Sequence, residues 1–87
     1  MDYVLAVFSI RTDTVLFNKI LQKNGVASSV VETPKFASAS CGISVRFAYK
    51  DLAKAKSLLA SSGTKSFVRF YLVNGMWGNI RVTPLKR

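Results

Sequence analysis

Residues 3–10 read Tyr3-Val4-Leu5-Ala6-Val7-Phe8-Ser9-Ile10, a nearly continuous apolar stretch. A run of this composition, rich in Val, Phe and Ile, is typical of a central β-strand that is buried on both faces of its sheet. The sheet is expected to be built around this stretch, and the segments after it supply the other elements.

A helix and a second strand are predicted directly after the first strand. Thr12 or Asp13 can cap the helix, and Asn24-Gly25 can end it. Residues 26–33 return to strand composition, and Pro34 ends that strand. The apolar positions of the helix recur at helical spacing: Val15, Leu16, Ile20 and Leu21.

Residues 42–49 predict a third strand. Ile43, Val45 and Phe47 alternate with smaller or polar side chains, and this period of two is typical of a half-buried strand. Neighbouring side chains on a strand point to opposite faces, so Phe47 is expected to face the helices and Arg46 the solvent.

The rest of the chain predicts a second helix and a C-terminal hairpin. Lys50-Asp51 opens the helix and Ser62-Gly63 closes it. Residues 66–73 form the fourth strand, Asn74-Gly75 is a strong turn signal, and residues 77–83 return as a hairpin partner. The apolar stripe of this helix consists of Leu52, Ala55, Leu58 and Leu59.

This order of elements predicts an α+β fold. It matches the ferredoxin-like split βαβ sandwich, with the order βαββαβ and an extra C-terminal strand or hairpin. The length of 87 residues suits one domain, residues 1–87, and not two.

The composition excludes several kinds of site. The chain has one cysteine and no histidine, so one chain cannot form a Cys/His zinc site, a Ser-His-Asp triad or a Cys-His dyad. The four acidic residues are scattered along the sequence, so no metal site is expected, and no cofactor is predicted. The composition therefore excludes these classes of catalytic site within one chain.

The only cysteine, Cys41, is the best candidate for chemistry. It lies among small residues and directly precedes Gly42, which allows a positive φ and a close approach of a ligand. Ser38 and Ser40 can donate hydrogen bonds to a thiolate. The basic residues Lys35 and Arg46 can lower the pKa of the thiol if they lie near it. The alternative is that Cys41 is a small buried apolar residue, as free cysteines often are.

Residues 33–47, TPKFASASCGISVRF, resemble the signature of the small bacterial selenium/sulfur carrier-like proteins. That signature has a Thr-Pro-Arg segment, a serine-rich stretch, Cys-Gly, an apolar pair and an Arg. The opening strand and helix and the segment Asp51–Lys56 are also similar, so that the resemblance spans residues 3–63. The matching positions are Pro34, Ser38, Ser40, Cys41, Gly42 and Arg46.

The resemblance implies a thiol that carries sulfur or selenium as a persulfide or selenosulfide on Cys41. It also implies a sulfur or selenium donor protein as the partner, and it favours a carrier or binding protein over an enzyme. The chain departs from the family pattern at Lys35, where Arg is common, and at Ala37 and Ala39, where serine is common. Residues 66–87 are longer and more basic than the family's tail.

The net charge of +9 supports an alternative function, a non-catalytic basic module that binds RNA or an acidic protein. Nucleic acid is the less favoured partner, because residues 66–71 lack the glycines of the RNA-binding signature. A homodimer through the exposed sheet face is a further expectation. The short N-terminal apolar run and the lone free cysteine predict a cytoplasmic protein without a membrane segment.

Overall fold

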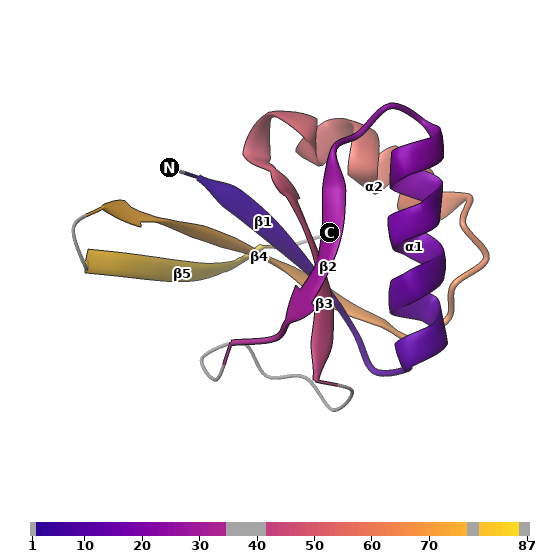
Figure 1. Cartoon of the computed structure of the whole chain (residues 1–87), viewed down its shortest axis with the longest axis horizontal. Helices are drawn as coiled ribbons and strands as arrows, with labels where there is room; N and C mark the ends of the chain where they lie inside the picture. The colour runs from indigo at the N-terminus through magenta and orange to yellow at the C-terminus, as the bar shows by residue number, and fades with distance from the viewer. Residues whose placement is uncertain (1, 35–41, 77–78, 86–87) are drawn as a thin grey trace.

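The computed structural model describes residues 2–34, 42–76 and 79–85. Five strands form one sheet in the order β2-β3-β1-β4-β5, and every pairing is antiparallel. Both helices lie on the same side of this sheet (Figure 1). The elements are β1 (Tyr3–Phe8), α1 (Arg11–Lys23), β2 (Ser28–Glu32), β3 (Ile43–Ala48), a 3₁₀ turn (Tyr49–Asp51), α2 (Leu52–Ala60), β4 (Phe67–Met76) and β5 (Asn79–Leu85).

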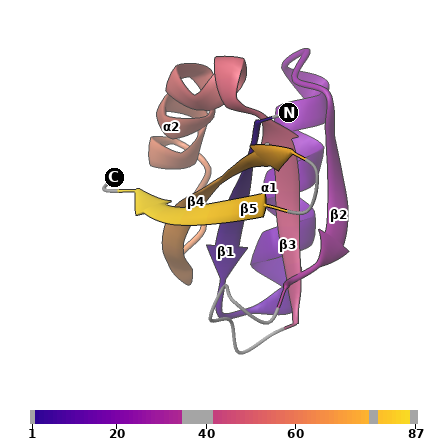
Figure 2. The same ribbon diagram turned by 90° about the vertical axis from the view of Figure 1, so that its left-hand side faces the viewer.

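The predicted α+β class, with its two helices and its C-terminal hairpin, is confirmed by this arrangement. Figure 2 shows the two helices behind the sheet, and the β4–β5 hairpin twisting across in front of β1. Within the ranges given above, no helix is long and apolar enough to cross a membrane.

Strand β1 is the central strand of the sheet, and both of its faces are buried, as predicted. Val4, Ala6 and Phe8 pack under the helices in one apolar cluster. Leu5 and Val7 belong to a second cluster on the opposite face, with Tyr71 and Val73 of β4. The strand ends at Phe8 rather than Ile10, because the chain turns at Ser9 and Ile10 into α1, which leaves Ile10 53% exposed.

Aromatic rings fill the space between the sheet and the helices. Phe8 of β1 lies 5.4 Å from Phe17 of α1 and 5.5 Å from Phe67 of β4, measured between ring centroids. Phe70 of β4 lies 4.8 Å from Phe67 and 6.1 Å from Phe47 of β3. The tilted and edge-on ring geometries are those that aromatic pairs favour, so this chain of rings joins α1 to three strands.

The predicted apolar face of α1, Val15, Leu16, Ile20 and Leu21, is confirmed for Leu21 and wrong for Val15 and Leu16. Thr14, Phe17 and Leu21 are buried, whereas Val15 and Leu16 are 38% and 42% exposed. Both sets of residues have helical spacing, so the periodicity did not distinguish them. The packing of the Phe17 ring against Phe8 decides which set faces the sheet.

Asp13 does not cap α1, which begins at Arg11 after Ile10 and has no side-chain cap. The Asp13 carboxylate instead accepts three hydrogen bonds from the loop between α2 and β4. The donors are the backbone N–H of Lys65 (3.2 Å), the backbone N–H of Ser66 (3.0 Å) and the Ser66 hydroxyl (2.7 Å). The predicted helix-starting role is therefore replaced by a tether between two segments that are distant in sequence.

The predicted turn at Asn74-Gly75 is also wrong. Strand β4 continues through both residues, which pair with Arg81 and Ile80 of β5. Gly75 has a φ of 150°, a value that residues with a side chain rarely adopt, so the glycine continues the ladder rather than making the turn. The hairpin connection therefore falls on residues 77–78, which lie outside the described ranges, as does the predicted loop-tip residue Trp77.

The corrected face of α1 predicts a large difference between two neighbouring positions. Phe17→Ala should lower the free energy of unfolding by about 3 kcal/mol or more, because it leaves a cavity under the sheet. Leu16→Ala should lower it by only about 0.5 kcal/mol, because that side chain is largely in water. Urea denaturation followed by circular dichroism measures both values, and equal losses would contradict the assigned face.

The Asp13 tether predicts a specific loss of stability in acid. The hydrogen bond from the Ser66 hydroxyl, with those from the Ser66 and Lys65 N–H groups, holds the pKa of Asp13 below its ordinary value of 3.8, although partial burial opposes this effect. A carboxylate with a lowered pKa stabilises the fold above its unfolded pKa, and this contribution is lost as the pH falls through the folded pKa.

Thermal unfolding from pH 6 to pH 2 should therefore show a steeper fall of Tm below about pH 4 in the natural protein than in Asp13→Asn. At pH 6 the Asp13→Asn variant should have the lower Tm. Asp2→Asn is the matched control, because Asp2 is an exposed acid at the start of β1. Parallel pH profiles of Asp13→Asn and the natural protein would show that the tether does not act as described.

Candidate functional site

The connection between β2 and β3 contains the residues that the sequence singles out. The two strands pair up to Glu32 and Ile43. One residue further on, the backbone N–H of Thr33 donates a hydrogen bond to the carbonyl of Gly42 (2.9 Å) and closes the base of the connection. Lys35, Ser38, Ser40 and Cys41 lie outside the described residues, and Pro34 and Gly42 mark the two ends of that segment.

Gly42 has a φ of 78°, in the region that favours glycine. A Cβ atom at this position would meet no atom of the described chain within 4 Å, so conformation rather than lack of space requires the glycine. The residue is exposed and directly precedes β3. Pro34, at the other end of the segment, is half-buried and follows the last residues of β2. The positions of Pro34 and Gly42 therefore follow from the pairing of β2 with β3.

A pair of hydroxyl groups beside this base was not expected from the sequence. The Oγ of Ser44 and the Oγ1 of Thr33 lie 2.5 Å apart and share a hydrogen bond. Ser44 is fully buried, although the alternation along β3 placed it on the exposed face. The sequence feature that could have predicted this pair is the position of Thr33 and Ser44 on either side of residues 34–42. It could be interpreted only once the register of β2 against β3 was known.

Arg46 lies toward the other end of β3 from Gly42. Arg46 is four positions further along the extended chain, a distance of about 13 Å. The guanidinium carbon of Arg46 lies 4.2 Å from the ring centroid of Tyr3, in cation–π geometry. Phe47 is buried under the helices and Arg46 is exposed, so their predicted opposite orientations are confirmed. The structure thus brings Pro34 and Gly42 together at one end of the strand and places Arg46 with Tyr3.

An open cavity of about 370 Å³ lies beside Arg46 at the ends of β1, β2 and β3. Its lining includes one acid, Asp2, and one base, Arg46, together with the hydroxyls of Ser28 and Ser29. The Ser28 hydroxyl is already engaged with the side-chain oxygen of Asn18 (2.7 Å). No group of three or more metal-ligating side chains occurs among the residues that the structure describes.

Comparison with known proteins identifies one family. No curated protein and no solved structure matches the chain significantly. The sequence model of the family described as "Putative Se/S carrier protein-like" matches residues 3–66. This match runs from the start of β1 to the residue before β4, and it includes the whole β2–β3 connection and Cys41. The chain therefore belongs to the Se/S carrier protein-like family.

Proposed function

We propose that this protein carries sulfur or selenium on Cys41 and passes it between protein partners. The observation that carries the proposal is the family match, which covers the segment with the chain's only cysteine. A carrier needs a nucleophilic sulfur. It must also lack a second cysteine in its own chain, because that cysteine would attack the persulfide before delivery. The composition satisfies this second requirement.

The geometry at the base of the β2–β3 connection supports this function. Gly42, which is bonded directly to Cys41, is exposed and held by its hydrogen bond from Thr33. The hydroxyl of the half-buried Thr33 and that of the buried Ser44 share a hydrogen bond that joins the two strands. A reacting group gains when the backbone next to it is held by hydrogen bonds of this kind.

The transfer step is a thiol exchange that needs no external oxidant. The thiolate of Cys41 attacks the outer sulfur of a donor's persulfide. The sulfur–sulfur bond of the donor breaks, the donor leaves as a thiolate, and a new sulfur–sulfur bond forms on Cys41. With selenium in the outer position, the same exchange gives a selenosulfide. Delivery to an acceptor thiolate repeats the exchange in the opposite direction and restores the Cys41 thiolate.

The partner that this function requires is a donor protein. The net charge of +9 favours a donor with an acidic surface around its reactive cysteine, because complementary charges speed association. We also propose that residues 1–87 form one domain. The strand order β2-β3-β1-β4 agrees with the ferredoxin-like split βαβ arrangement, in which β5 is an addition at the edge.

Intact-mass spectrometry tests the proposed function directly. After incubation with a cysteine desulfurase and cysteine, the protein should gain the mass of one sulfur atom, and dithiothreitol should remove it. Cys41→Ala should gain nothing while keeping the circular dichroism spectrum of the natural protein. A natural protein that gains no sulfur, or a Cys41→Ala variant that gains as much, would overturn the proposal.

A pair of glycines offers a matched test of the site's location. Gly42 and Gly63 have φ values of 78° and 79°, and at both positions an added Cβ meets nothing within 4 Å. Gly42→Ala and Gly63→Ala should therefore lose similar amounts of unfolding free energy, about 1 kcal/mol each.

Only Gly42→Ala should load sulfur more slowly, because only Gly42 adjoins Cys41. The rate of mass gain under the desulfurase, measured beside urea denaturation, gives both quantities. Equal loading rates in the two variants would show that the conformation at Gly42 does not serve the thiol.

A further inference from the structure

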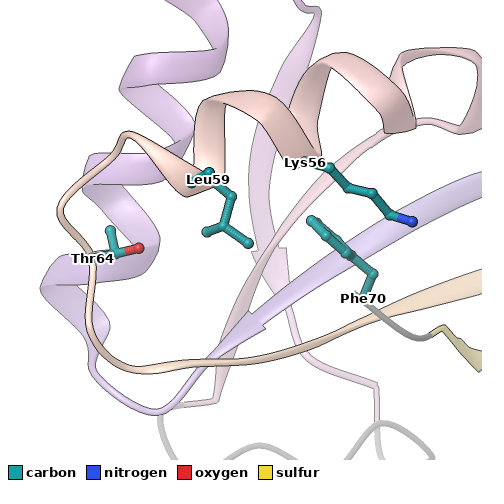
Figure 3. A pocket seen from close by; sticks show the side chains of 5 residues that line it. Lys56, Leu59, Thr64 and Phe70 are labelled. Atoms are coloured by element: carbon teal, nitrogen blue, oxygen red, sulfur yellow. The ribbon is translucent and has the colours of Figure 1, made fainter.

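A second cavity, of about 350 Å³, lies between α2, the loop after it and β4. Among the described residues, its lining combines apolar side chains with the polar groups of Lys56 and Thr64. Leu59, Ala60 and Phe70 form the apolar part. Figure 3 shows Leu59 projecting from α2 toward the ring of Phe70, the Lys56 side chain extending from the same helix past that ring, and Thr64 on the loop beyond Leu59.

The short length of α2 explains why this space is open. The helix has nine residues and ends at Ala60. The chain then runs to Ser66, which the Asp13 carboxylate holds against α1. The hydroxyls of Ser62 and Thr64 share a hydrogen bond of 2.8 Å, which orders this loop beside the cavity. The walls of the cavity are therefore fixed by contacts that do not involve its interior.

The rim of the cavity carries the positive charge of Lys56. Lys56 is half-buried and forms no ion pair within the part of the chain that the structure describes. Phe70, on the floor, is fully buried and is held by Phe47 and Phe67. A cavity that is partly apolar and partly polar, with a lysine at its edge, is complementary to a molecule with an apolar body and one negative charge.

We propose that this cavity, which we call the α2–β4 pocket, binds a small aromatic carboxylate. The ring of the ligand lies against Leu59 and Ala60, above the buried Phe70, and its carboxylate pairs with the ammonium group of Lys56. The volume of about 350 Å³ lies within the range of small-molecule sites and accommodates a single-ring acid.

The α2–β4 pocket lies on the other face of the sheet from the hydroxyl of Ser44, at the base of the β2–β3 connection. Phe70 pairs across the sheet with Ala6, and Ala6 pairs with Val45, which faces the helices. Ser44 precedes Val45 on β3 and therefore points to the opposite face of the sheet. Ligand binding in the pocket thus neither requires Cys41 nor depends on sulfur transfer.

Nuclear magnetic resonance of the ¹⁵N-labelled full chain tests the α2–β4 pocket. The probe is 3-phenylpropionate, titrated to about 10 mM because a ligand of this size binds weakly. The uncharged 3-phenylpropan-1-ol serves as its counterpart. The carboxylate should shift the amide signals of Leu59, Ala60, Thr64 and Phe70 in a saturable manner. The alcohol should bind about fivefold more weakly, because it cannot pair with Lys56.

Two variants of one helix distinguish the role of the charge. Lys56→Gln should weaken binding of 3-phenylpropionate about fivefold and leave the alcohol unaffected. Lys54→Gln removes the same charge, but its ammonium group lies over the turn at Gly25, so binding should be unchanged. Ala60→Phe, at an exposed position, should fill the pocket and abolish binding of both compounds.

The spectra themselves report whether each variant is folded. No saturable shift in the natural protein would overturn the proposal, as would shifts centred away from the α2–β4 pocket. Equal effects of Lys56→Gln and Lys54→Gln would overturn the role of the charge. Cys41→Ala should bind the probe as the natural protein does, whether or not the natural protein accepts sulfur.

Discussion

The burial of β1 on both faces is the constraint on which the rest of the structure depends. Its side chains from Val4 to Phe8 are all apolar and almost fully removed from water. A strand with this composition is stable only with a hydrogen-bonded strand on each side and apolar cover above and below. The neighbouring strands are β3 and β4. The helices cover one face of β1, and Tyr71 and Val73 contact the apolar side chains on the other face. The first βα unit consists of β1 and α1, and the second of β3 and α2. Their strands lie side by side at the centre of the sheet.

Composition was sufficient to predict this centre, but not the details that packing decides. A continuous apolar run predicted β1, and alternation of apolar and polar residues predicted β3. In α1, Val15 and Leu16 are as apolar as the buried residues and have equally regular spacing, so only the contact of Phe17 with Phe8 selects the face. Asn74-Gly75 resembles a turn in sequence, yet its pairing with β5 depends on the length of the partner strand.

The candidate site shows the same division between local and long-range information. The Cys-Gly pair at 41–42 and Pro34 are local features of the sequence, and they identify the connection that holds the candidate site. The Thr33–Ser44 hydroxyl pair and the contact of Arg46 with Tyr3 depend on register across strands. Arg46 is close to Cys41 in sequence, but the extended strand carries it away from Gly42 and toward the amino end of β1.

The Asp13 tether has a consequence for the order of folding. It joins a residue of the first βα unit to the loop that follows the second helix, 53 positions further along the chain. Neither segment can make these hydrogen bonds alone, so the tether forms only when both units have docked on β1. Contacts that complete a fold late stabilise the native state more than the transition state. The tether is therefore expected to retard unfolding while leaving the rate of folding nearly unchanged, and so to prolong the lifetime of the folded chain.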